Sequence, residues 1–298
     1  MKKTLIAMAA VAVAGVSSAQ VTITGKLGFG VRDSSTSAKE LSWTDGAVTF
    51  AASEDLGGGM TASASTTMAG MQSHGDGATI KGDGSSISLS GPFGAVSYAS
   101  GASASDRLGV GAGLLISGGT VFGGDSNEVA QFNYTLPSLV EGLGVTFRLG
   151  GSKDGNDAVA LTNKDAQLRL AYTAGALGLT YNTIGGTAPA TDMGVTYDLG
   201  IAKFAYAADV TGTYAVDGQG KRTEWSVSVP VSGDLTVAMS TGTRAASSDG
   251  SKKRASATEF NAAYALSKRT TVNAAYATVT NTSNVKQTAN TIKLVHTF

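Results

Sequence analysis

The sequence predicts an all-β chain that closes into a transmembrane antiparallel β-barrel of sixteen strands. Segments of about ten residues with alternating apolar and polar side chains recur along the chain, as in strands that have two different faces. The connectors between these segments alternate between short and long. No run of 18 consecutive apolar residues follows Gln20, so no transmembrane helix is predicted. An even number of strands with short turns at one end and longer loops at the other is typical of membrane barrels.

The segment VTITGKLGFGV, residues 21–31, shows the alternation most clearly. Its larger apolar side chains share one face, and threonine, lysine and glycine residues occupy the other. The segments LGVTFRLG (143–150) and AQLRLAY (166–172) repeat the pattern. The expected strands begin near residues 21, 42, 59, 80, 94, 128, 143, 164, 177, 190, 202, 222, 235, 256, 271 and 289.

The connectors fall into two classes that alternate along the chain. The short ones, such as SEDLGGG (53–59) and LSKR (266–269), predict periplasmic turns. The longer, more polar ones predict extracellular loops near residues 32–41, 70–79, 100–127, 151–163, 183–191, 212–221, 244–255 and 280–288. A soluble β-sandwich would not require short and long connectors to alternate in this way.

The first nineteen residues have the pattern of a secretory signal peptide. Lys2 and Lys3 precede an apolar run from Leu5 to Val16, and small residues follow it. The run is too short to span a bilayer as a helix. We therefore expect residues 1–19 to be removed before Gln20, and residues 20–298 to form a single barrel domain.

The composition excludes several classes of protein. The chain has 40 Gly, 4 Pro, 15% charged residues and no Cys, so disulfides do not stabilise it and it is not a highly charged disordered chain. Lys plus Arg and Asp plus Glu both number 22, and removal of Lys2 and Lys3 leaves 20 against 22, a net charge of −2. This charge offers no footprint for nucleic acid. No cofactor or metal is expected.

The width of the barrel decides which face points inward. Sixteen strands enclose an interior too wide for side chains to fill, so the lumen is expected to hold water and the apolar face to meet lipid. Charged side chains then belong on the lumen side, because a Lys or Arg near the midplane of the lipid face costs about 2–4 kcal/mol. The cations with this parity are Lys26, Arg148, Arg169, Lys203 and Lys293, with Arg32 expected at the rim. The acids with this parity are Asp209, Glu224 and Glu259.

The chain ends on TIKLVHTF, which alternates like a strand up to its last residue. A barrel inside a membrane cannot leave an unpaired strand edge in lipid. We therefore expect this segment to be the closing strand and to pair with the first one. On its apolar face, His296 and Phe298 are expected in the interfacial girdle, as are Trp43 and Trp225.

Several stretches resemble the general porins of the Gram-negative outer membrane, and most closely the β-proteobacterial type. The resemblance covers nearly the whole mature chain and is carried by FAASEDLGGGMTASAS (50–65), SGPFGAVSYAS (90–100), NEVAQFNYTLPSLVEGLGVTF (127–147), YALSKRTTVNAAYA (264–277) and the ending His296–Phe298. EDLGGG, LSKRT and the terminal Phe298 are its most specific parts.

This resemblance implies a homotrimer in the outer membrane that lets small hydrophilic solutes and ions diffuse passively. Outer-membrane lipid, lipopolysaccharide and the barrel assembly machinery are the implied partners, with Phe298 as the assembly signal. The third extracellular loop, residues 100–127, is expected to fold into the lumen and narrow it. It lacks the acidic PEFGG-like segment common in the family, and its charged candidates for the constriction are Asp106, Arg107 and Asp125.

The lumen charges allow two interpretations. The basic wall facing a loop poor in acid predicts a mild preference for anions. Alternatively, these side chains are solvated and give no net bias, because a slip of one residue in parity removes a charge from the count.

Other functions have less support in the sequence. GVGAG (109–113) lacks the third glycine of a dinucleotide loop, and DGNDA and DGSKK lack the full ligand spacing of a calcium loop. With no Cys and only His74 and His296, no nucleophile–base pair is visible, so no enzyme is expected. The alternative function is a plugged barrel that acts as an adhesin or structural protein.

Overall fold

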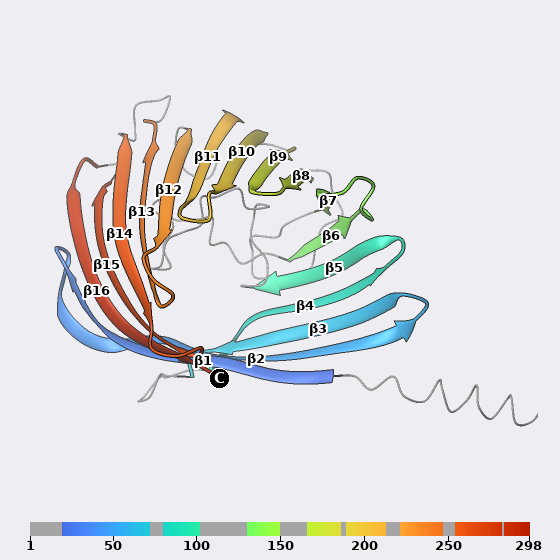
Figure 1. The fold of residues 1–298 in the computed structure, drawn as a ribbon, viewed down its shortest axis with the longest axis horizontal. Helices are drawn as coiled ribbons and strands as arrows, with labels where there is room; N and C mark the ends of the chain where they lie inside the picture. Colours follow the sequence, from blue (N-terminus) through green and yellow to red (C-terminus); the bar gives the residue numbers. More distant parts are fainter. Residues whose placement is uncertain are drawn as a thin grey trace, which may run out of the picture.

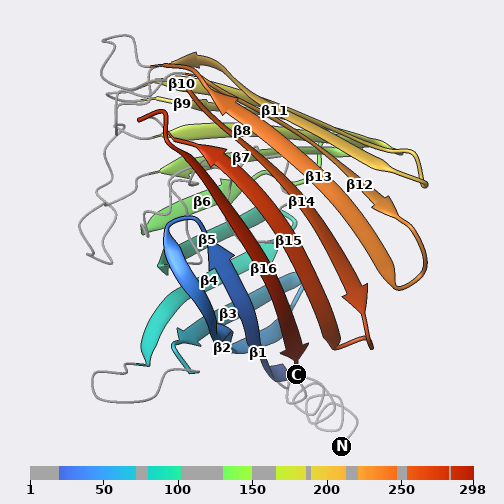
Figure 2. The same ribbon diagram turned by 90° about the vertical axis from the view of Figure 1, so that its left-hand side faces the viewer.

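The computed structural model describes residues 20–71, 80–101, 130–149, 166–185, 189–212, 221–246, 254–281 and 283–298. Sixteen antiparallel strands form one closed barrel in which each strand pairs with its neighbours in sequence and β1 pairs with β16. Figures 1 and 2 show the strands curving around a common axis. The first and last strands, β1 and β16, lie side by side and form the seam that closes the barrel. Among the described residues, no helix has the length and hydropathy of a membrane span.

The first eight strands are β1 (Gln20–Ser34), β2 (Ser37–Gly57), β3 (Met60–Ala69), β4 (Lys81–Gly91), β5 (Gly94–Gly101), β6 (Gln131–Thr135), β7 (Leu143–Leu149) and β8 (Gln167–Ala174). The others are β9 (Leu177–Ile184), β10 (Ala190–Asp198), β11 (Lys203–Gly212), β12 (Arg222–Pro230), β13 (Leu235–Arg244), β14 (Ala255–Ala265), β15 (Thr270–Thr280) and β16 (Lys286–Thr297). The predicted number and order of strands are confirmed.

The glycines of the short turns take backbone conformations that other residues rarely adopt. In the turn between β2 and β3, Gly57, Gly58 and Gly59 have φ values of 78°, 63° and 77°. A side chain at these positions would strain the backbone. The EDLGGG stretch is therefore a turn whose direction depends on glycine.

Two of the expected long loops are wrong. Residues 32–41 belong to a hairpin in which β1 continues to Ser34 and β2 begins at Ser37, and residues 280–288 are shortened because β16 begins at Lys286. The hairpin tip is bonded to β16: the Ser35 N–H donates to the Thr288 carbonyl and the Thr288 N–H donates to Ser35 Oγ, both at 2.9 Å. These hydrogen bonds hold the extended strands together.

The distribution of side chains is inverted relative to that of a soluble barrel. Large apolar residues such as Phe29, Trp43 and Tyr206 are exposed on the outer face, whereas Asn182 and Glu259 are almost fully buried on the inner face. The buried hydrophobic side chains among the described residues are mainly alanines. The apolar face thus points outward, as the width of a sixteen-stranded barrel predicts.

The predicted girdle residues lie on this outer face. The rings of Phe29 and Trp43 meet edge to face, with centroids 6.4 Å apart. Trp225 is also exposed, and His296 Nδ1 lies 2.9 Å from Thr270 Oγ1. Their depth relative to a bilayer stays a prediction.

Candidate functional site

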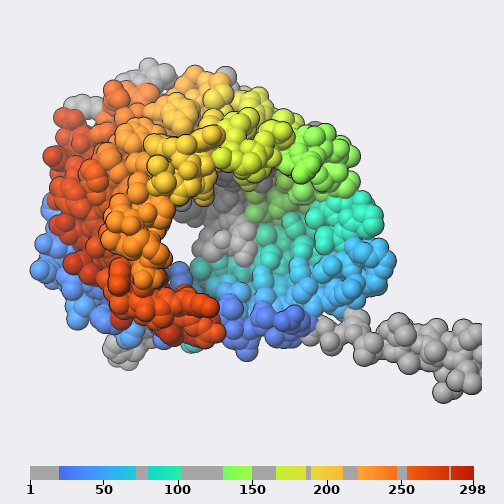
Figure 3. Space-filling model, viewed as in Figure 1, coloured from blue at the N-terminus to red at the C-terminus, as the bar shows by residue number. Residues whose placement is uncertain are grey.

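The candidate site is the inner wall of the barrel. Figure 3 shows the strands surrounding a central hollow. Because side chains alternate along each strand, every second residue faces this hollow. The inner positions are occupied mainly by polar, charged and small residues, and three sectors of this wall differ in chemistry.

The first sector lies at the seam of the barrel, where three charged side chains from three strands meet. Lys26 of β1 places Nζ 3.1 Å from Oδ1 of Asp45 of β2. Lys293 of β16 donates from Nζ to Oδ2 of the same carboxylate at 3.3 Å. The Thr44 hydroxyl donates to that Oδ2 at 3.0 Å. We call Lys26, Asp45 and Lys293 the seam triad.

Two glycines of β1 make room for the seam triad. Gly28 lies opposite Asp45, and Gly30 lies opposite Lys293. A Cβ atom at Gly28 would lie 3.0 Å from Asp45 Oδ2, and one at Gly30 would lie 2.7 Å from the Lys293 Cβ. The side chains of β2 and β16 can therefore approach each other across β1 only because both positions lack a side chain.

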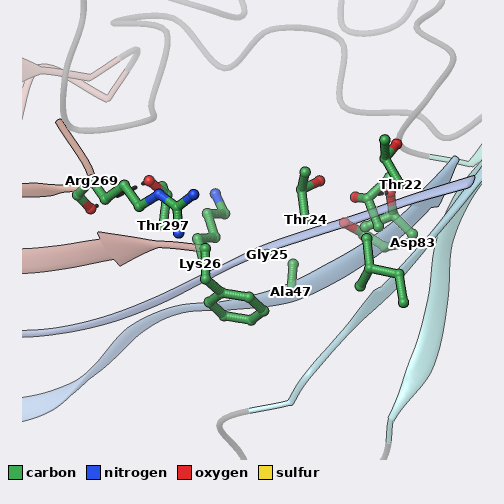
Figure 4. A pocket seen from close by; sticks show the side chains of 12 residues that line it. Thr22, Thr24, Gly25, Lys26, Ala47, Asp83, Arg269 and Thr297 are labelled. Carbon is green, nitrogen blue, oxygen red and sulfur yellow. Dashed lines mark hydrogen bonds between the residues drawn. The ribbon is translucent and has the colours of Figure 1, made fainter.

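A pocket of about 900 Å³ adjoins the seam triad. Lys26 lines it together with Arg269, from the turn between β14 and β15, and with Asp83. Figure 4 shows Lys26, Arg269 and Thr297 close together at one end and Asp83 at the other. The remaining lining includes the threonines Thr22, Thr24, Thr49 and Thr67. This part of the wall can solvate ions and hydroxylated solutes through both charges and hydroxyl groups.

The second sector, on β2 to β8, joins hydroxyl groups to two arginines. Hydroxyl pairs bridge neighbouring strands at 2.7–2.8 Å: Thr49 with Thr67, Ser63 with Ser88, and Ser65 with Ser86. Further round the barrel, Arg148 Nε donates to Asn133 Oδ1 at 2.9 Å. Arg169 lies opposite Thr146 and Asn182 on the adjacent strands. Both arginines have the parity of the inner face, and their role in lining the pore stays a prediction.

The third sector, on β10 to β14, carries buried acids. Asp192 lies directly opposite Asp209 in the ladder, and Asn182 Nδ2 donates to Asp192 Oδ2 at 3.4 Å. Asp209 Oδ2 accepts the Arg222 N–H at 2.8 Å, and the Arg222 guanidinium lies 3.8 Å from its other oxygen. The predicted inward acids Asp209, Glu224 and Glu259 are all buried on this wall. Their charges are thus largely withdrawn from solvent.

The other predicted site residues occupy different positions. Lys203 pairs with Asp198 at 3.4 Å beside the turn between β10 and β11, and both side chains are about half exposed (51% and 49%). Arg32 lies opposite Glu40 and Thr291 in the ladders of β1, two residues before the end of the strand. Asp106, Arg107 and Asp125 lie outside the described residues, as does most of the predicted constriction loop.

Sequence reasoning missed Asp45 and Asp192. Asp45 follows a β-bulge at which the register with β1 shifts, so its parity cannot be counted from the apolar residues before it. Asp192 is the third residue of β10, next to a second register shift. The sequence did contain one signal. Gly28 and Gly30 are two glycines on the same face of β1, and they leave space there for side chains from the neighbouring strands.

The sequence model of the Gram-negative porin family matches residues 5–284. No curated protein matches the chain. Among solved structures, an anion-selective porin from Comamonas acidovorans is 18% identical with a TM-score of 0.70, and the match covers 94% of this chain and 100% of that one.

Two further porin structures are similar in fold. OmpT of Vibrio cholerae in its trimer form is 10% identical with a TM-score of 0.67, and the match covers 94% of this chain and 100% of that one. A mutant of the Rh. blastica porin is 12% identical with a TM-score of 0.62, with the same coverage of both chains. The polar wall, the apolar outer face and the family match agree, and the chain belongs to the Gram-negative porins, the passive diffusion channels of the bacterial outer membrane.

Proposed function

We propose that this porin has a mild preference for small anions. The observation that carries the proposal is the unequal exposure of the lumen charges. The Lys26 side chain is 50% exposed, whereas Asp192, Asp209, Glu224 and Glu259 are almost completely buried. An ion in the lumen comes closest to the exposed charges, and exposed lysines lower the energy of an anion and raise that of a cation.

Three further features support this preference. Arg269 lines the pocket beside Lys26, so it adds a cation at the same wall. The Arg222 guanidinium partly offsets the charge of Asp209. One porin of similar fold, from Comamonas acidovorans, is anion-selective.

The test is the reversal potential across a planar bilayer separating two KCl concentrations. The proposal predicts a potential of the sign produced by chloride, and replacement of Lys26 by Gln should bring it closer to zero. A reversal potential at zero or of the sign produced by potassium overturns the anion preference. Such a result leaves the assignment to the porin family intact.

We also propose that the barrel assembles as a homotrimer and that the barrel assembly machinery and lipopolysaccharide are its partners. The similarity to the trimer form of OmpT supports the trimer. The position of Phe298 at the end of the closing strand supports its proposed role as an assembly signal. Mass measurement of the detergent-solubilised protein, before and after heating, tests the trimer: the unheated protein should have three times the mass of the chain.

Residues 1–19 are proposed to be a signal peptide that is removed before Gln20. The proposal is supported by the sequence of these residues, in which a lysine pair, an apolar run and small residues precede Gln20, the first residue of β1. N-terminal sequencing of the protein purified from outer membranes should therefore start at Gln20. A start at Met1 would contradict the proposal.

A further inference from the structure

We propose that Asp45 sets the strength of the anion preference by cancelling one of the two lysine charges at the seam. This inference rests on the proposed function, because it names the residue that limits the anion preference. The carboxylate is shared between Lys26 at 3.1 Å and Lys293 at 3.3 Å. The seam triad therefore has two positive charges and one negative charge.

The carboxylate is held in a fixed position by groups from its own strand and from its neighbours. The Thr44 hydroxyl donates to Oδ2, the oxygen that also accepts from Lys293, and Lys26 approaches the other oxygen. The Asp45 side chain is only 12% exposed. Its charge thus belongs to the wall of the channel and cannot swing away from the lysines.

The two lysines differ in their access to the lumen. The Lys293 side chain is 18% exposed and the Lys26 side chain is 50% exposed. Lys293 holds the carboxylate from the side of β16, and Lys26 faces both the carboxylate and the pocket that Arg269 also lines. A passing anion therefore meets Lys26 and Arg269, while Asp45 reduces the attraction that it feels.

The seam triad depends on β1, the strand that lies between Asp45 and Lys293. β2 and β16 are each paired to β1, so Asp45 and Lys293 interact across an intervening strand. Gly28 and Gly30 leave the surface between them free of side chains. In the seam triad, one carboxylate is shared between two cations, one from β1 and one from β16.

Charge counting gives a sharp test. The wild-type seam triad has a net charge of +1, D45N raises it to +2, K293Q lowers it to zero, and the double variant D45N/K293Q returns it to +1. We expect D45N to raise the chloride-to-potassium permeability ratio about twofold at low salt, with a smaller change at high salt because of screening. K293Q should lower the ratio, and the double variant should return it to the wild-type value.

Asp198 provides the matched control, because it also pairs with a lysine but both side chains are half exposed, beside the turn between β10 and β11. D198N should change the permeability ratio less than D45N does. Heat-modifiable gel mobility shows that each variant is folded before the recording. If D45N does not fold, the lower chloride-to-potassium permeability ratio expected for K293Q tests the same inference.

The outcomes separate this inference from the proposed function. A wild-type channel without anion preference, together with a D45N channel shifted toward chloride, overturns the proposed function and supports the role of Asp45. An anion-selective wild type with unchanged ratios in D45N and K293Q overturns the role of Asp45. Equal shifts in D45N and D198N also overturn it, because the effect would then be one of net charge alone.

Discussion

Gly25 and Phe298 form a reciprocal pair of hydrogen bonds that joins the first strand to the end of the chain. The Gly25 N–H donates to the Phe298 carbonyl at 2.9 Å, and the Phe298 N–H donates to the Gly25 carbonyl at 3.0 Å. A Cβ at Gly25 would lie 2.7 Å from Cε2 of the Phe298 ring. The last residue is thus bonded into the seam, with its ring over a position that has no side chain.

Replacement of Gly25 by Leu should weaken this closure. The new side chain would occupy the position of the Phe298 ring, and crowding of this kind costs about 1–3 kcal/mol. We expect a lower midpoint in urea unfolding of the protein in lipid vesicles, followed by gel mobility. G82A is the control, because nothing lies within 4 Å of a Cβ at Gly82. Equal midpoints for G25L and the wild type would contradict a role of this contact.

The Gly30→Ala substitution should disturb the seam triad, because Gly30 lies opposite Lys293. Its methyl group would lie 2.5 Å from the Ile292 carbonyl oxygen and 2.7 Å from the Lys293 Cβ, so β16 would have to move. We expect a loss of stability of about 1–3 kcal/mol together with a changed permeability ratio. G144A, also on the inner face, meets its nearest atom at 3.8 Å and should leave both quantities unchanged.

Two adjacent alanines of β15 test the assignment of the faces. Ala274 lies opposite Ile292, whose side chain is exposed on the outer face, whereas Ala275 lies opposite Thr291 and Asn261 on the inner face. Ala274→Arg should reduce the free energy of unfolding in vesicles by about 2–4 kcal/mol, because it places a charge against lipid. Ala275→Arg should fold normally and alter conductance. The reverse pattern would show that the faces are exchanged.

Arg169→Gln should reduce the anion preference without unfolding the barrel. Arg169 lies on the inner face between Thr146 and Asn182, and glutamine keeps a donor for its neighbours while removing the charge. The expected result is a lower chloride-to-potassium permeability ratio, measured from the reversal potential at low salt. Arg244→Gln, at the end of β13, is a control for a cation near a strand end and should have a smaller effect. An unchanged ratio in R169Q would remove Arg169 from the residues that select ions.

The strands that face lipid were predictable from the sequence, and the extended hairpin was not. In β12, Trp225 and Val227 alternate with Glu224 and Ser226, because one face meets hydrocarbon and the other meets water. Residues 37–42, SAKELS, lack a sustained alternation of apolar and polar side chains, so their sequence looks like that of a loop although they form part of a paired strand. Its pairing with β1 appears only in the structure.

The lumen residues were predictable in part for a related reason. Lys26, Arg148, Arg169 and Lys293 keep the parity of their strands, so counting from the apolar residues places them inside. Asp45 could not be placed, because the bulge at Thr44 shifts the count by one residue. Which charges become buried also depends on the strands that meet around the barrel, and alternation within one strand contains no such information.

The most direct test is electrical recording of the refolded protein in a planar bilayer, with a salt gradient applied after channels have inserted. The porin assignment predicts stepwise, ohmic conductance. The proposed trimer predicts closure in groups of three, and the proposed anion preference predicts a reversal potential of the sign produced by chloride. Absence of conductance from protein that heat-modifiable gel mobility shows to be folded would contradict an open diffusion channel. It would favour a plugged barrel with an adhesive or structural role.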